Sequence, residues 1–185
     1  MTHEKRFRWH VIHDHIKHIE NPVGAEIGAH RGECSGHLLE LHPRLKLYMI
    51  DMWSPNTYAG KGDDAATEPF RKIYQDESRE NYNITYMSTE IYADRRIILI
   101  GGSVERAQFF FNDELDFCFI DASHAYKDVK ADIIAWLPKI KKGGYLFCHD
   151  YGLFEGVTRA VTEMFTFNQD YDLYIDDDYM AAVRV

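Results

Sequence analysis

A short segment near the N-terminus has the residues needed for close backbone contact with a ligand. Glu26 to Gly32 reads E-I-G-A-H-R-G, an E-x-G-x-x-x-G pattern. Gly28 and Gly32 allow sharp turns and leave room for a bound molecule beside the backbone. Asp51 ends the next apolar run, and a carboxylate there can accept hydrogen bonds from both ribose hydroxyls. We predict ribose binding by Asp51, with a turn or helix-capping role as the alternative. The spacing differs from the G-x-G-x-x-G fingerprint, which disfavours a nicotinamide dehydrogenase.

Two further apolar runs end in acids and histidines. Asp121 follows Leu115 to Ile120, and His149 and Asp150 follow Tyr145 to Cys148. If these runs are neighbouring strands, about 4.8 Å apart, the two carboxylates can share one divalent cation. Without a cation the carboxylates repel each other, which raises the pKa of one of them. Oxygen-rich ligation favours Mg²⁺, with Mn²⁺ possible, whereas His149 would favour a softer ion.

Strand-like and helix-like segments that alternate along the chain would position these residues. Strands are predicted at 23–28, 45–50, 97–100, 115–120 and 145–148, and a hairpin at 171–185. Helices are predicted at 33–41, about 68–82, 104–111, 126–140 and 157–165, with a loop at 53–66. The alternation predicts an α/β, Rossmann-like, doubly wound fold: a mostly parallel seven-stranded sheet with helices on both faces and an antiparallel strand from the C-terminal hairpin. Asp176 to Asp178 are expected to form a solvated hairpin turn.

Size and composition indicate one globular domain over residues 1–185, with residues 1–20 as an accessory N-terminal helix. The net charge of -9 argues against a nucleic-acid partner. A mean hydropathy of -0.41 and the lack of a long apolar run argue against a membrane span. No apolar segment follows the charged N-terminus, so no signal peptide is expected. With three cysteines that lack metal-type spacing, we expect a cytoplasmic protein.

Four segments resemble class I S-adenosylmethionine-dependent methyltransferases. They are AEIGAHRGECS, YMIDMWS, ILIGGSVE and, above all, FIDASHAYKDVKADIIAWLPKIKKGGYLFCHDY. More narrowly, the chain is similar to the group that contains macrocin and rhamnosyl O-methyltransferases, and distantly to catechol O-methyltransferase. The resemblance covers about residues 23–185 and implies S-adenosylmethionine as the cofactor.

The same resemblance implies roles for individual residues. Glu26, Gly28 and Gly32 would hold the methionine part of the cofactor, Asp51 its ribose, and Gly102, Ser103 and Val104 its adenine. Further cofactor contacts would come from Ala29, Ser35, Met52 and Asp121. Trp53 would cover the adenine or the acceptor, or else pack within its loop. Metal-dependent relatives ligate the metal at the positions of Asp121 and Asp150, and His149 completes the metal set predicted here.

A hydroxyl group is too weak an acid to attack a sulfonium methyl group unaided, so a metal and a base would both help. His124 follows Asp121 in a D-x-x-H pattern, and in similar sugar methyltransferases the histidine at this place is the base. Asp121 and His124 are therefore the predicted catalytic residues, with helix capping as the alternative role for His124. We expect a metal-assisted O-methyltransferase (EC 2.1.1.-) that acts on a hydroxyl of a sugar or other small molecule.

Two alternatives remain open. One is a metal-independent small-molecule methyltransferase with His124 or His149 as the base. The other is a non-catalytic module that binds S-adenosylmethionine and serves a partner. A homodimer is also considered, because a second copy, the N-terminal helix and the 53–66 loop would add walls to a small acceptor pocket.

Overall fold

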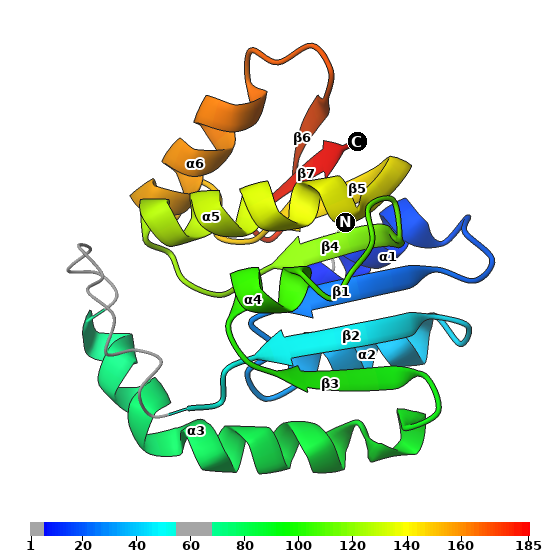
Figure 1. Ribbon diagram of the computed structural model, residues 1–185, viewed down its shortest axis with the longest axis vertical. Coiled ribbons are helices and arrows are strands. Elements are labelled where there is room, and N and C mark those ends of the chain that lie inside the picture. The colour runs from blue at the N-terminus through cyan, green and yellow to red at the C-terminus, as the bar shows by residue number, and fades with distance from the viewer. Residues whose placement is uncertain (1–5, 55–67) are drawn as a thin grey trace, which may run out of the picture.

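One sheet contains every strand in the described part of the chain (Figure 1). The computed structural model describes residues 6–54 and 68–185, without the side chains of residues 68–76. The strand order is β3-β2-β1-β4-β5-β7-β6. The first five strands run parallel, whereas β7 is antiparallel to both of its neighbours. The strands are β1 (Val23–Ile27), β2 (Lys46–Asp51), β3 (Arg96–Ile100), β4 (Leu115–Ile120), β5 (Ile140–Cys148), β6 (Asp172–Asp176) and β7 (Met180–Arg184).

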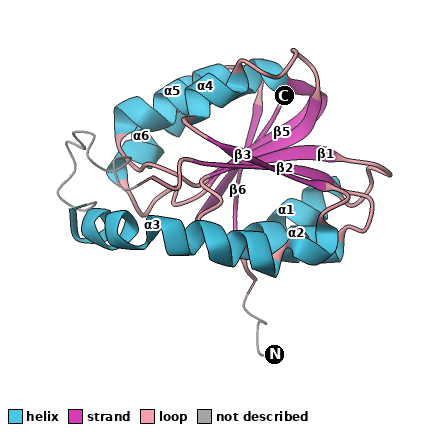
Figure 2. Cartoon of the chain, turned by 60° about the horizontal axis from the view of Figure 1, so that its bottom comes forward, coloured by secondary structure: helices cyan, strands magenta, loops and turns pink. Residues whose placement is uncertain are grey.

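Helices cover both faces of the sheet, which confirms the predicted α/β, Rossmann-like class. On one face lie α1 (Arg8–Ile16), α2 (Glu33–Leu41) and α3 (Glu68–Ser88). On the other lie α4 (Ser103–Ala107), α5 (Tyr126–Trp136) and α6 (Glu155–Phe165) (Figure 2). Two apolar layers result, one around Leu38 and Phe117 and one around Ile133 and Val161. Each fully buried aliphatic or aromatic side chain contributes about 1.5–3 kcal/mol, so these layers stabilise the sandwich of helices and sheet. That residues 1–185 form one domain stays a prediction.

The carboxyl ends of β1 and β4 lie side by side at the centre of the sheet. The chain proceeds outward from β1 to β2 and β3, then crosses back to β4 on the other side of β1. Connections therefore diverge between β1 and β4, which is where open α/β sheets bind ligands. Gly28 makes the close approach possible: its φ is +92°, and a Cβ atom there would lie 2.1 Å from the carbonyl oxygen of Asp121.

The end of α5 differs from the prediction. A helix was expected to Ile140, with a strand starting at Tyr145 after Gly143 and Gly144. The structure ends α5 at Trp136, continues as a short 3₁₀ helix (Leu137–Lys139) and begins β5 at Ile140. Pro138 explains the boundary, because proline lacks an N–H donor and restricts the residue before it. The glycine pair lies inside β5 instead of ending a helix.

The hairpin expected at Asp176 to Asp178 is present, with Asp177 exposed, and its acids also bind the N-terminal segment. Asp178 Oδ2 accepts a hydrogen bond from the backbone N–H of Arg8 at 2.8 Å. Asp177 Oδ2 accepts one from Arg6 at 3.0 Å, and Asp176 Oδ2 lies 2.8 Å from His15 Nε2. These contacts join Arg6 and both ends of α1 to the far end of the chain. No local pattern indicates them, because the partners are more than 150 residues apart in the sequence.

Replacing Gly24 in β1 with alanine tests the packing of the sheet. An added Cβ atom would lie 2.2 Å from ring carbons of the fully buried Phe117. Overpacking of this kind costs about 1–3 kcal/mol, so the denaturant midpoint of Gly24→Ala should fall with little change in slope. Gly36→Ala, inside α2, is the matched control, because the added Cβ atom would contact only the Thr89 side chain, at 3.9 Å. It should preserve stability or raise it by up to about 1 kcal/mol. Equal midpoints for wild type and Gly24→Ala would contradict this packing.

Candidate active site

Glu26 is a buried acid at the end of β1. Its side chain accepts a hydrogen bond from the hydroxyl of Ser35, a buried residue of α2. Burial raises the pKa of Glu26 to about 8, partly offset by the Ser35 hydrogen bond. Glu26 lies just before the turn from Gly28 to Gly32, and the φ of Gly32 is +73°. A positively charged group beside this acid would offset the cost of burying its charge.

Asp51, at the end of β2, has both carboxylate oxygens engaged with backbone. Oδ2 accepts a hydrogen bond from the N–H of His30 at 2.9 Å, and Oδ1 from the N–H of Trp53 at 3.0 Å. The Trp53 indole donates in turn to the carbonyl of His30 at 2.7 Å. His30 and Trp53 have left-handed backbones, with φ of 48° and 38°. Asp51 therefore supports two strained residues, and its remaining lone pairs can accept further hydrogen bonds.

The predicted adenine-binding segment follows β3. Gly102 precedes α4, and Ser103 and Val104 open it. The Ser103 hydroxyl accepts a hydrogen bond from the Trp136 indole at 2.9 Å, so this side chain faces α5. Val104, by contrast, is exposed, as are Met52 and Ile100 at the neighbouring strand ends. An exposed apolar surface here suits a flat aromatic ring, whereas the Ser103 side chain serves the packing of α4 on α5.

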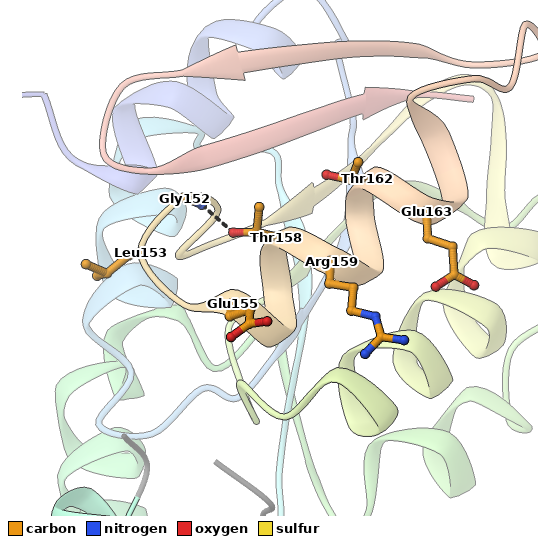
Figure 3. Close-up of a pocket in the computed structure, with 7 residues that line it drawn as sticks. All are labelled: Gly152, Leu153, Glu155, Thr158, Arg159, Thr162 and Glu163. Carbon is orange, nitrogen blue, oxygen red and sulfur yellow. Dashed lines mark hydrogen bonds between the residues drawn. The ribbon is translucent and has the colours of Figure 1, made fainter. Parts of the chain in front are cut away.

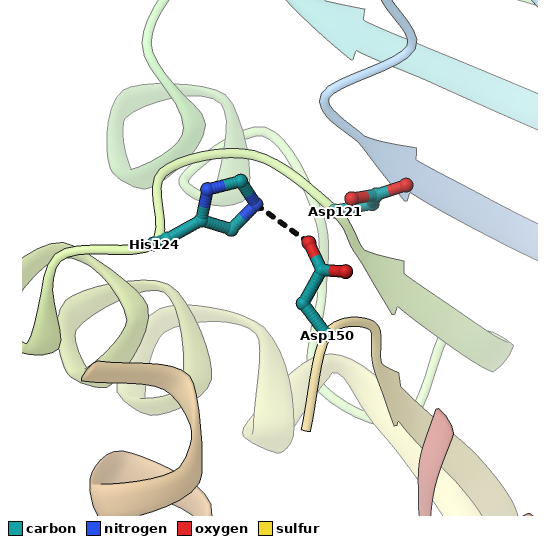
Figure 4. A group of neighbouring side chains, drawn as sticks. All are labelled: Asp121, His124 and Asp150. Carbon is teal, nitrogen blue, oxygen red and sulfur yellow. Dashed lines mark ion pairs between the residues drawn. The ribbon is translucent and has the colours of Figure 1, made fainter. Parts of the chain in front are cut away.

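Asp121, His124 and Asp150 come together beyond β4 and β5 (Figure 4). One potential ligand atom from each lies within 4.8 Å of the others. His124 Nε2 lies 2.8 Å from Asp150 Oδ2, while the second ring nitrogen of His124 points away from both carboxylates (Figure 4). The His124 ring also stacks on Phe154, with ring centroids 4.1 Å apart. Two carboxylates and an imidazole are a donor set that fits a divalent cation.

His149 lies between the same carboxylates but deeper. Its Nδ1 is 3.4 Å from Asp121 Oδ1 and 3.2 Å from Asp150 Oδ1, and its Nε2 is 3.7 Å from Asp178 Oδ2. Burial alone would lower the pKa of His149, but Asp121 and Asp150 raise it to about 10. Burial has the opposite effect on Asp150 and would raise its pKa. His124 and His149 outweigh this effect of burial and hold the pKa of Asp150 below its usual range. The four side chains thus form one cluster of acid–histidine pairs.

The cluster thus places the predicted residues in two layers. Asp121 and Asp150 are central, His124 is on the outer side with 23% of its side chain exposed, and His149 is beneath with 10% exposed. Both histidines reach the carboxylates, and His124 joins them in the group with metal-ligand spacing. Sequence reasoning named His149 for the metal and His124 for the base. It missed Arg8, whose guanidinium also contacts Asp121, at 3.3 Å.

A broad depression on the described surface lies elsewhere. It measures about 610 Å³, runs along α6 and the preceding loop, and contains none of the predicted site residues (Figure 3). Its lining residues are Gly152, Leu153, Glu155, Thr158, Arg159, Thr162 and Glu163. A much smaller cavity is lined by Asp121, His124 and His149 among others. The convergence of charged groups at the strand ends, and not the size of the hollow, identifies the candidate site.

Comparison with known proteins identifies the family of the chain. The methyltransferase-domain family profile matches residues 25–151, more than half of the chain, so the chain belongs to the methyltransferase-domain family. The matched segment runs from β1 through Asp150 and includes the glycine turn, Asp51 and the acid–histidine cluster. The predicted resemblance is thereby confirmed. Comparison with curated proteins gave no match.

Solved structures share the fold at low sequence identity. The O-methyltransferase NovP superposes with a TM-score of 0.71 at 17% identity, over 96% of this chain and 78% of NovP. A putative caffeoyl-CoA O-methyltransferase from Staphylococcus aureus gives a TM-score of 0.67 at 14% identity, over 97% of this chain and 83% of its own. A putative O-methyltransferase from Klebsiella pneumoniae gives a TM-score of 0.64 at 13% identity, over 100% of this chain and 83% of its own. None of the described helices is long and apolar enough to cross a membrane.

The burial of Glu26 predicts a pH dependence of stability. Between its ordinary pKa of 4.5 and about 8, the folded protein keeps a proton that the unfolded chain releases. The folded state therefore binds more protons, and the free energy of unfolding falls as pH rises through this window, by on the order of 1 kcal/mol per pH unit. Glu26→Gln lacks this effect, so its advantage over wild type should grow from about pH 5 to 8 in urea unfolding. Parallel profiles for the two proteins would show that Glu26 is not desolvated.

Proposed function

We propose that the protein transfers a methyl group from S-adenosylmethionine to a hydroxyl group of a small-molecule acceptor, with help from a divalent cation. The observation that carries the proposal is that two groups of polar residues lie next to each other at the carboxyl ends of β1 and β4. A glycine turn with Glu26 and Asp51 lies on one side, and Asp121, His124 and Asp150 lie on the other. Family membership supports methyl transfer, and the names of NovP and the other neighbours support oxygen as the acceptor atom.

The residues present fit the cofactor. Gly28 forms a turn that a side chain would fill. Glu26 would offer a buried carboxylate to the ammonium of the methionine part, and Asp51 would accept hydrogen bonds from the ribose. The exposed apolar residues Met52 and Val104 flank the adenine position. S-adenosylmethionine supplies a methyl group on a positively charged sulfur, and the acids at these strand ends favour that charge.

Asp121 and Asp150 fit a cation, since each presents a carboxylate oxygen to a common centre with an imidazole nearby. A bound divalent cation lowers the pKa of a hydroxyl group that it contacts. His124 is then the base: its ring takes the proton as the acceptor oxygen bonds to the methyl carbon and the carbon–sulfur bond breaks, and Asp150 Oδ2, 2.8 Å from Nε2, stabilises the protonated ring. Phe154 restricts the ring by stacking on it.

One observation favours a second candidate, methyl transfer without a metal. The His124–Asp150 pair at 2.8 Å has the arrangement in which a carboxylate orients an imidazole base and stabilises its protonated form. Such a pair suits an acceptor with a more acidic hydroxyl, such as a phenol, because that proton is removed more easily. The metal titration below separates the two candidates.

Cofactor binding is measurable by calorimetry. The wild type should bind S-adenosylmethionine, and Asp51→Asn and Asp51→Ala should weaken binding at least about 10-fold, because a hydrogen bond to a charged group contributes about 1.5–3 kcal/mol. Asp94→Ala, an exposed aspartate before β3, is the control and should bind like the wild type. Absence of binding by the wild type, or equal affinity in the Asp51 variants, would contradict the assignment.

Metal binding is measurable with Mn²⁺ as the probe, by electron paramagnetic resonance of the free ion. The Asp121→Asn and Asp150→Asn variants should each weaken Mn²⁺ binding at least about 10-fold. Even the replacement of a residue that only hydrogen-bonds to a metal ligand lowers metal affinity by about 10–100-fold. Because His124 contacts Asp150, His124→Gln should also weaken Mn²⁺ binding, by about 10–100-fold. Unchanged Mn²⁺ affinity in Asp121→Asn and Asp150→Asn would contradict the proposed ligands, and no Mn²⁺ binding by the wild type would favour the metal-free candidate.

A further inference from the structure

Arg8 reaches the candidate site from the first residue of α1. Its Nη1 lies 3.3 Å from Asp121 Oδ2, and its Nη2 lies 3.3 Å from Glu33 Oε2. Asp121 follows β4, and Glu33 begins α2 directly after the glycine turn. The guanidinium therefore spans the gap between these two elements, beside the turn from Gly28 to Gly32. Only 26% of the Arg8 side chain is exposed.

The charges around this gap are predominantly negative. Asp121 and Glu33 contact the Arg8 guanidinium directly, and the buried Glu26 lies at the end of the neighbouring strand β1. A cofactor that ends in an amino acid brings one ammonium and one carboxylate to this place. Glu26 suits the ammonium, whereas the carboxylate would face Asp121 and Glu33 unless a cation lies between them.

The present contacts of Arg8 leave its pairing capacity incompletely used. Its two terminal nitrogens bind different carboxylates through single long contacts, instead of binding one carboxylate through two parallel hydrogen bonds. A guanidinium is geometrically matched to such a two-point partner. A ligand carboxylate that enters the gap between Asp121 and Glu33 would provide it.

Arg8 is not required to attach α1 to the rest of the protein. The helix buries Trp9, Val11, Ile12 and Ile16, and the backbone N–H of Arg8 is bound by Asp178. Partly exposed ion pairs contribute only about 0–1 kcal/mol. The β6–β7 turn thus fixes the backbone at Arg8, and the side chain is positioned for another task.

We propose that Arg8 binds the carboxylate of the cofactor's methionine part, and that the N-terminal segment is thereby a wall of the cofactor site. The inference rests on the proposed function, because it assumes that S-adenosylmethionine binds at the glycine turn. It adds a residue that lies outside the segment matched by the family profile.

The test compares two ligands that differ only in the carboxylate. S-adenosylmethionine and its decarboxylated form are titrated by calorimetry into wild type, Arg8→Gln and Arg6→Gln. Arg6 is the matched control, because it pairs with Asp14 and Asp177 away from the site. Arg8→Gln should weaken S-adenosylmethionine binding at least about 10-fold and change binding of the decarboxylated ligand by less than about 3-fold. Arg6→Gln should change neither.

Two other results would contradict either carboxylate binding by Arg8 or the proposed function itself. Equal weakening of both ligands, or of neither, would refute carboxylate binding by Arg8 while leaving the proposed function intact. Failure of the wild type to bind either ligand would refute the proposed function itself. Arg8→Lys, which keeps the charge but loses the two-point geometry, provides a second variant if Arg8→Gln is unfolded, and should have intermediate affinity for S-adenosylmethionine alone.

Discussion

The close contact between the ends of β1 and β4 is the constraint on which the rest of the site depends. Gly28 can lie against the backbone of Asp121 only because it has no side chain and adopts a positive φ. That contact brings the turn after β1 and the acid–histidine cluster after β4 and β5 to a single place. Any side chain at Gly28 would separate the two halves, because its Cβ atom would overlap the Asp121 carbonyl. One residue without a Cβ therefore allows a ligand to span both.

A second constraint is electrostatic. Asp121, Asp150 and Asp178 approach His149 from different elements, and the raised pKa of His149 keeps a positive charge among them. The acids are thus held close together without the repulsion that bare carboxylates would suffer. A divalent cation would serve the same purpose from the outer side, near His124. The same acids fix α1, because Asp178 binds the backbone of Arg8.

Local patterns were sufficient to predict the sheet and the strand-end residues. Continuous apolar runs such as Leu115–Ile120 are typical of parallel strands buried on both faces, and the polar residue after each run must lie at the carboxyl edge. The end of α5 was mispredicted because the glycine pair was given more weight than Pro138. The contacts of Arg8 and of Asp176 to Asp178 were not predictable, since they join segments at opposite ends of the sequence. The alternatives for Trp53 stay open, and its indole holds the turn at His30.

A crystal structure with S-adenosylhomocysteine, the product of methyl transfer, would test the central claim most directly. The account predicts density along the turn from Gly28 to Gly32, with the ribose at Asp51 and the homocysteine part beside Glu26. Density elsewhere, for example in the depression along α6 (Figure 3), would contradict it. So would crystals that bind no ligand at concentrations that saturate other members of the family.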